Sequence, residues 1–183
     1  MIWFIADPHF GHTNIIKYAK RPFEDLVRMN AHLVARWQKT VKPTDIIYVL
    51  GDFAFGSRAY AEWLVDHLHG IKILIHGNHD RGHRAMESLG FACCLSSAVV
   101  NLDGKDIMLS HRPIYGPLPD NVSGIFHGHT HRANPADLYE AGECAYIPPW
   151  NVNLCVELWE YTPVPYKCAL KELRKNMSSG KDV

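Results

Sequence analysis

Short apolar runs that each end in a cluster of polar residues are the feature of this sequence that most restricts its fold. The runs and the polar residues behind them are IWFIA (2–6) with Asp7, IIYVL (46–50) with Gly51 and Asp52, and IKILI (71–75) with HGNHD (76–80). Continuous apolar runs of this length, bounded by turn residues, are typical of buried β-strands. We therefore expect three buried strands, each delivering polar side chains at its carboxyl end.

Segments with a helical period separate these strands. The apolar faces consist of Leu26, Met29, Leu33 and Trp37 in one helix, and of Tyr60, Leu64 and Leu68 in another. Ser57 suits the N-cap of the second helix and Gly70 its end, and a shorter helix over 83–89 ends at Gly90. Alternation of strands and helices predicts right-handed crossovers and a largely parallel sheet.

The second half of the chain has a different pattern. Strands over 99–102 and 105–109 flank Asp103-Gly104, a strong hairpin signal. Further strands are expected over 124–126 and 151–158. The stripe formed by Tyr166, Ala169, Leu173 and Met177 predicts a helix within 163–177. The 183-residue length fits one domain over 1–177, followed by a disordered tail over 178–183.

Composition excludes several classes of protein. Lys plus Arg equals Asp plus Glu, at 19 each, so neither a membrane surface nor long nucleic acid is indicated as a partner. The N-terminal segment has neither a basic region nor an apolar stretch long enough for a signal peptide. Five cysteines without a CxxC pair favour reduced thiols. We expect a soluble cytoplasmic protein, and the sequence leaves its oligomeric state open.

Polar clusters follow five of the expected strands and would meet at the carboxyl edge of the sheet, where open α/β folds place their sites. They are Asp7-Pro8-His9, Gly51-Asp52, Gly77-Asn78-His79-Asp80, Ser110-His111 and Gly128-His129-Thr130-His131. Their oxygen and nitrogen ligands suit Mn, Fe, Zn or Ni, and the ligands outnumber what one ion takes. Two ions that share a carboxylate are therefore expected. Taken singly, Asp7, Asp52 and Asn78 would instead suit helix caps.

The ordered set DxH, GD, GNHD, H and GHxH, over residues 7–131, resembles the calcineurin-like metallophosphoesterase superfamily. The opening DPHFGHTNII resembles a small single-domain bacterial and phage branch of it. The resemblance implies an α/β fold, a four-layer α/β/β/α sandwich with two mixed sheets. It also implies a metal-dependent phosphoric ester hydrolase.

The resemblance assigns a role to each motif residue. The first metal would be held by Asp7, His9, Asp52 and His131, and the second by Asp52, as the bridge, with Asn78, His111 and His129. His79 would assist the leaving group, and Asp80 would orient His79. Hydroxide bridging two divalent cations, with manganese favoured over iron, zinc, nickel or magnesium, would attack the phosphate ester, a diester by preference. A phosphomonoesterase acting on a small-molecule, nucleotide or protein phosphate and a non-catalytic binding or scaffold protein are the alternatives.

Other polar residues near the motifs have two interpretations each. His12 either approaches the site or caps the helix that contains 14–20. Arg81, Arg112 and Arg132 directly follow motif residues. They either form a cationic rim that binds a second phosphate of a nucleotide-like substrate, or point into solvent. His76 and His127 should point away from the ligands by strand alternation.

Overall fold

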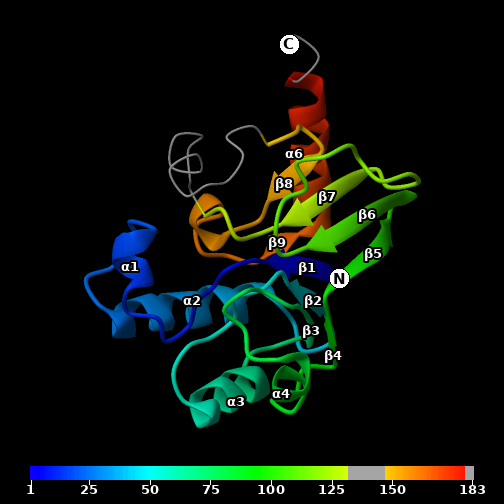
Figure 1. Ribbon diagram of the computed structural model, residues 1–183. Helices are drawn as coiled ribbons and strands as arrows, with labels where there is room; N and C mark the ends of the chain where they lie inside the picture. The colour runs from blue at the N-terminus through cyan, green and yellow to red at the C-terminus, as the bar shows by residue number, and fades with distance from the viewer. Residues whose placement is uncertain (132–146, 180–183) are drawn as a thin grey trace.

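The computed structural model describes residues 1–131 and 147–179 and shows an α/β protein with two mixed β-sheets (Figure 1). The first sheet has the order β4-β3-β2-β1-β9. Its strands are β1 (Ile2–Ile5), β2 (Ile46–Val49), β3 (Ile71–Ile75), β4 (Cys93–Leu95) and β9 (Val164–Pro165). Strands β1 to β4 run parallel, as the alternating pattern predicts, and β9 pairs antiparallel with β1.

The second sheet has the order β5-β6-β7-β8. Its strands are β5 (Ser97–Leu102), β6 (Lys105–Ser110), β7 (Gly124–His127) and β8 (Asn151–Asn153). The predicted hairpin is confirmed, because Leu102 pairs with Lys105 across a two-residue turn. Asp103 and Gly104 both have positive φ, as the tight turn between twisted antiparallel strands requires.

Helices α2 (Leu26–Thr40), α3 (Arg58–His67) and α4 (His83–Glu87) lie beside the first sheet, and α1 (Ile15–Tyr18) precedes them (Figure 1). The predicted N-cap is confirmed: Ser57 Oγ accepts a hydrogen bond from Tyr60 N at 3.2 Å. Asp25 caps α2 in the same way through Arg28 N. These side chains satisfy amide groups that the first turn of a helix leaves without partners.

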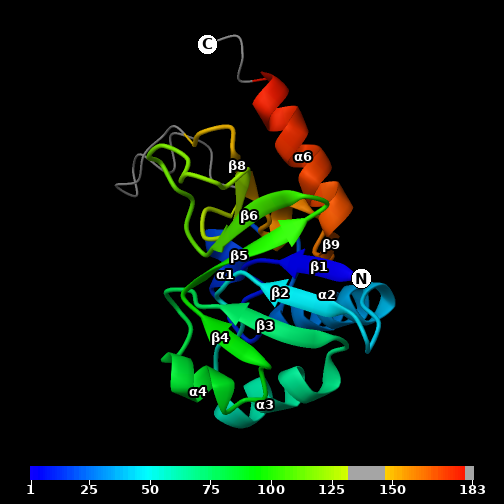
Figure 2. The same cartoon turned by 90° about the vertical axis from the view of Figure 1, so that its right-hand side faces the viewer.

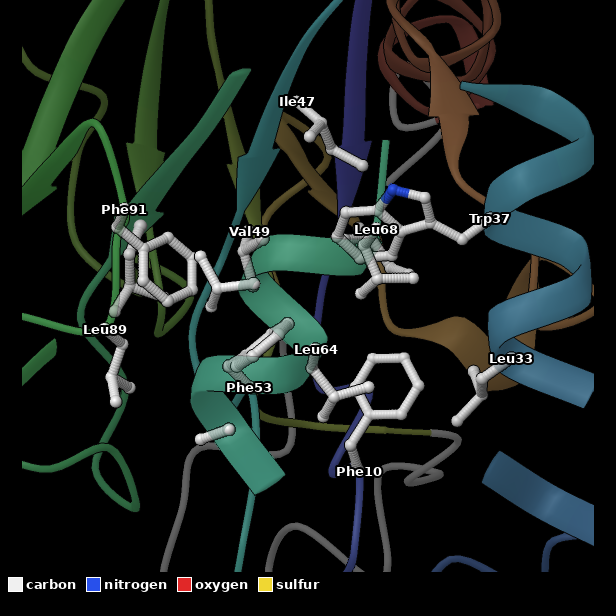
Figure 3. Packing of buried hydrophobic residues seen from close by; sticks show 14 of the residues in the cluster. Phe10, Leu33, Trp37, Ile47, Val49, Phe53, Leu64, Leu68, Leu89 and Phe91 are labelled. Carbon is white, nitrogen blue, oxygen red and sulfur yellow. The ribbon is translucent and has the colours of Figure 1, made fainter. Parts of the chain in front are cut away.

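The apolar faces of α2 and α3 that the periodicity predicts pack against the first sheet (Figure 3). Leu33 and Trp37 of α2 and Leu64 of α3 pack with Ile47 and Val49 of β2, and none is more than 1% exposed. Complete burial of such side chains stabilises the fold by about 1.5–3 kcal/mol each relative to exposure. This core fixes the strands whose carboxyl ends carry the polar clusters.

A second core joins the two sheets. Phe4 of β1 meets Phe126 of β7 edge-on, with ring centroids 5.2 Å apart. Helix α6 (Tyr166–Ser179) packs on the second sheet, where Leu173 lies so close to Gly124 that a side chain at that position would collide with it. Figure 2 shows the sheets one above the other, with α6 beside the upper one and α3 and α4 below the lower one.

The segment 151–158, expected as one strand, is a short strand followed by a 3-10 helix, η1 (Val156–Leu158). After Asn153 the chain leaves β8 and bonds to the first sheet: Ala6 N donates to Leu154 O, and Val156 N donates to Ala6 O. Its apolar residues are therefore buried by crossing between the sheets. Helix α6 continues to Ser179, so the expected tail begins inside it, and 180–183 lie outside the described residues. None of the described helices is both long and apolar enough to cross a bilayer.

Candidate metal centre

The carboxyl ends of β1, β2 and β3 meet at one edge of the first sheet, and those of β6 and β7 meet at one edge of the second. Contacts between these ends join the two edges. His129 follows β7 in the sequence, and its backbone N–H donates a hydrogen bond of 2.7 Å to Oδ2 of Asp7, which follows β1. His111 follows β6, and its Nδ1 lies 2.9 Å from the carbonyl oxygen of Leu50, which follows β2. The polar clusters of all five strands consequently form one site.

Asp7, His9 and His131 form one group of potential metal ligands, with ligand atoms all within 4.8 Å of one another. His9 Nε2 lies 3.8 Å from Asp7 Oδ1 and 3.5 Å from Asp52 Oδ2. The His9 and His131 rings stack with centroids 5.3 Å apart. Asp7 and His9 are buried, so this half of the site lies deep between the sheets.

Asp7, Asp52 and His111 form a second group. Asp52 Oδ1 lies 3.7 Å from His111 Nε2, while its Oδ2 faces His9. Asn78 Oδ1 lies 2.8 Å from His111 Nε2, and the His129 ring lies 5.0 Å from that of His111. Asp52 thus presents one oxygen to each half of the site, as a carboxylate shared by two cations would.

Hydrogen bonds fix which nitrogen of two histidines faces the site. Leu50 O can only accept, so His111 donates its Nδ1–H there, and His131 donates its Nδ1–H to Glu157 Oε1 at 2.9 Å. Each ring then keeps Nε2 for the site, the arrangement of metal-binding histidines.

Two ligand atoms have no hydrogen-bond partner within the described part of the chain: Asp7 Oδ1 and His9 Nε2, both fully buried. A buried polar atom without a hydrogen-bond partner destabilises the fold, because it has lost its hydrogen bonds to water and gained none in the protein. Both atoms point to the same space, so a cation there would satisfy them together. The residues present therefore fit a divalent metal ion.

The electrostatics of the cluster also favour a bound cation. Burial raises the pKa of the Asp7 carboxyl to about 6, although the nearby His131 and His111 lower it. Burial, with help from His131, lowers the pKa of His9. Burial disfavours charged forms in both cases. A bound cation would favour the ionised carboxylate and the neutral imidazole, which are the forms that bind metal.

The ligand residues have an unusual backbone. Positive φ angles occur at Asp7 (53°), His9 (50°), Asp52 (54°), His129 (69°) and His131 (48°). Outside glycine this left-handed conformation costs about 1–2 kcal/mol per residue. Strain of this kind concentrates at functional sites, where the surroundings hold it. The sharp turns at these residues direct the ligand side chains that follow β1, β2 and β7 toward the same site.

The Asp80 side chain contacts backbone amides of two neighbouring loops. Its carboxylate accepts backbone hydrogen bonds from Asp52 N (2.9 Å), Phe53 N (2.9 Å) and Gly77 N (2.8 Å). It makes no hydrogen bond to His79 among the described residues. This half-buried carboxylate, which accepts from three amides, ties the loop that follows β3 to the loop that follows β2 and so holds Asp52. Its pKa is raised by burial, and the amide hydrogen bonds offset part of that rise.

His79 lies at the open side of the centre. Its side chain is 50% exposed, and Nε2 is 4.0 Å from Asp52 Oδ2. The His79 backbone N–H donates to Asp52 Oδ1 at 2.9 Å. The backbone is therefore anchored at the site while the imidazole faces solvent, where a substrate would arrive.

The remaining predicted site residues divide into three cases. His12 does approach the site, with Nδ1 3.3 Å from His9 Nδ1 and its ring stacked on Phe55 at 3.9 Å. Arg81 and Arg112 are exposed, and Arg81 Nη2 donates to Gly56 O at 2.8 Å. Arg132 lies outside the described residues.

Comparisons with known proteins place the chain among relatives without a stated activity. No protein-family model matches it. The uncharacterized protein MJ1445 of Methanocaldococcus jannaschii is 33% identical to it, over 95% of this chain and 92% of MJ1445. The chain belongs to the MJ1445 family. Gene 66 protein of Mycobacterium phage D29 is 30% identical, over 71% of this chain and 78% of the phage protein.

A solved structure supports the same fold for this family. The crystal structure of AQ665 from Aquifex aeolicus, a protein of unknown function, aligns with a TM-score of 0.72 and 26% identity. The alignment covers 93% of this chain and 98% of AQ665. The phosphoesterase YfcE of E. coli aligns with a TM-score of only 0.40 at 22% identity, over 71% of this chain and 69% of YfcE, too low a likeness to establish a shared fold.

Sequence reasoning missed Glu157, Arg21 and Cys155, which lie directly behind the ligands. Glu157 accepts from His131, and Arg21 Nη2 lies 2.7 Å from Glu157 Oε1. Cys155 Sγ donates to Asp7 Oδ2 at 3.2 Å. Burial alone would raise the pKa of Glu157, but His131 and Arg21 hold it below its usual value. The available signal was an acidic residue inside the apolar run CVEL, because a buried charge requires a partner.

Proposed function

We propose that this protein is a metal-dependent phosphoric ester hydrolase that uses two divalent cations at the joined strand ends. Phosphodiesters are the favoured substrates. The two sheets and their flanking helices would then form the four-layer α/β/β/α sandwich of the metallophosphoesterases. The family itself carries no stated activity, so the proposal rests on the chemistry of the site and on the motif resemblance.

One observation carries the proposal: two groups of potential ligands share Asp7, and Asp52 of the second group faces His9 of the first. Two buried ligand atoms of the first group have no hydrogen-bond partner among the described residues. Asp7, His9, Asp52 and His131 would hold one cation. Asp52, Asn78, His111 and His129 would hold the other. The ligands are oxygens and imidazole nitrogens with no thiolate, the set that favours a hard or borderline ion such as manganese.

The protein groups divide the work of hydrolysis. When bound, the cations would lower the pKa of water and neutralise charge on the phosphoryl group. Asp52 would set the spacing of the pair, and Asp80 would hold Asp52 through its bonds to the loop. His79, half exposed beside Asp52, would donate a proton to the departing oxygen. Proton donation matters most for a poor leaving group, which favours a diester.

The substrate would be a nucleotide-like phosphate ester. Arg81 and Arg112 carry exposed cations on segments that directly follow ligand-bearing loops, and would bind a second phosphate. The balanced net charge favours a small substrate over long nucleic acid. A cytoplasmic location belongs to the same proposal.

The test combines metal content with paired assays. The purified protein, loaded with Mn²⁺, is analysed by mass spectrometry of its metals and assayed on chromogenic phosphate monoesters and diesters. Two metals per chain with faster diester cleavage support the proposal, and faster monoester cleavage assigns the protein to phosphomonoesterases instead. Asp52→Asn should lose both metals, because the shared carboxylate charge disappears. His67→Ala, an exposed histidine on α3, is the matched control and should lose neither. Wild-type protein without metal or hydrolysis refutes the proposal.

A further inference from the structure

The Arg21–Glu157 ion pair lies behind the metal centre, and no motif of the sequence includes either residue. We infer that this buried pair is a positioning device that sets the affinity of the His131-containing cation site. The inference rests on the proposed metal centre but does not depend on the substrate. Glu157 forms a further group of potential ligands with His131 and Cys155, but its Oε1 already accepts hydrogen bonds from Arg21 and His131. We therefore infer that Arg21 and Glu157 act through the ligand residues that they contact.

Arg21 has its side chain fully buried and uses every part of its guanidinium. Nε donates to Glu157 Oε1 at 2.8 Å. Nη2 donates to Asp7 O at 2.7 Å, and Nη1 donates to Pro8 O at 2.9 Å. These two carbonyls belong to the turn in which Asp7 and His9 have positive φ. The planar fork thus holds the strained turn from behind.

Glu157 joins this turn to the opposite side of the centre. The same Oε1 that accepts from Arg21 accepts Nδ1–H of His131 at 2.9 Å. That bond places the proton of neutral His131 on Nδ1 and leaves Nε2 as the nitrogen that can bind a cation. It also makes the imidazole a better donor, since a carboxylate behind a ligand histidine raises its basicity. One buried carboxylate, 136 residues along the chain from Arg21, therefore links the turn at Asp7 and His9 to His131.

A structural ion pair alone does not account for this arrangement. A buried pair is often no better for stability than apolar residues of similar volume. Here the charges also contact two ligand segments, and the guanidinium bonds go to the carbonyls of a ligand turn. These contacts favour a role for the ion pair in positioning the ligands and so in raising the affinity for metal.

The test uses Co²⁺ titration, monitored by visible absorption, on wild-type protein, Glu157→Gln and Arg21→Lys. Gln keeps an acceptor for His131 but removes the charge, and Lys keeps a charge but lacks the fork. We expect both to weaken one of the two Co²⁺ sites about 10–100-fold and to shift its absorption band, with the other site changed less. Arg28→Lys changes an exposed, ion-paired arginine on α2 and should match wild type.

The outcomes separate this inference from the proposed function. Variants that melt at lower temperature yet keep wild-type Co²⁺ affinity and spectrum overturn the inference, because the pair is then structural only. Wild-type protein that binds Co²⁺ but cleaves no phosphate ester contradicts the proposed function and leaves the inference standing. If a variant does not fold, nuclear magnetic resonance of metal-free wild type decides. A His131 ring protonated on Nδ1 supports the inference, and one protonated on Nε2 overturns it.

Discussion

Gly128→Ala adds one methyl group at the place where the two sheets meet behind the metal centre. A Cβ there would lie 2.8 Å from Ala6 Cβ and 3.0 Å from Leu50 O, and closer still to Asp7 Oδ2. Real Cβ atoms essentially never come within 3.0 Å of such neighbours. Leu50 O is backbone and Ala6 is buried in a strand junction, so the carboxylate of Asp7 is the group free to move.

The size of the effect follows from that displacement. To restore an ordinary contact, the Asp7 carboxylate must retreat by about 1 Å, whereas metal–ligand distances tolerate about 0.2 Å. The move also disturbs the bonds from His129 N and Cys155 Sγ to Asp7 Oδ2. We expect at least about a tenfold loss of affinity for one cation. Overpacking should also lower the free energy of unfolding of the metal-free protein by about 1–3 kcal/mol.

Isothermal titration with Mn²⁺ measures the affinity, and urea unfolding in chelator measures the stability. Gly82→Ala is the matched control, because a Cβ at position 82 meets no atom within 4 Å. It should leave both quantities near their wild-type values. If Gly128→Ala retains wild-type affinity and stability, the junction is looser than the structure shows, and the close approach of Asp7 to Gly128 is not what holds the ligand.

Three further changes test the catalytic, acid-stability and packing arguments. His79→Ala should keep both metals but lower kcat about 10²–10⁴-fold in diester assays, as loss of a proton donor does, and loss of metal would contradict that role. Hydrogen bonds from the N-terminal ammonium, at 2.7 Å, and from backbone and indole N–H groups lower the pKa of Asp45 to about 2. Its stabilising effect is therefore complete above the unfolded value of about 3.9 and disappears as pH falls through about 2, so urea titrations of wild type and Asp45→Asn should converge at low pH. Leu64→Ala, at a fully buried position on α3, should cost about 2–5 kcal/mol in urea unfolding, whereas Val27→Ala, at a site 76% exposed, should stay within about 0.5 kcal/mol.

Strong local patterns made most of the first sheet predictable. The runs that became β1, β2 and β3 are apolar because both faces of each strand are covered. Leu33 and Trp37 showed the buried face of α2 because a helix repeats its face every 3.6 residues. β9 and β4 escaped prediction, since two or three residues cannot display a period. The prediction of one strand over 151–158 was wrong beyond Asn153, because an apolar segment that crosses between two sheets has the same composition as a strand.

The candidate site was predictable only for residues that follow the expected strands in the sequence. Asp7, Asp52 and His111 do, and their convergence follows from parallel pairing. Asp80 also stands in a motif, but its partners are backbone amides, which a sequence does not reveal. Arg21 lies between α1 and α2 in a stretch without any pattern, so only the three-dimensional contacts identify it.

The supporting contacts bear on how the centre would respond to metal. Five ligand residues hold positive φ angles, each at a cost of about 1–2 kcal/mol. Protein groups already hold the strained turns, since Arg21 bonds to the carbonyl of Asp7 and Asp80 to the amide of Asp52. A cation bound there would therefore spend little of its binding energy on ordering these turns. Metal should accordingly raise the melting temperature in proportion to the logarithm of its concentration, while the secondary structure of the metal-free protein stays unchanged.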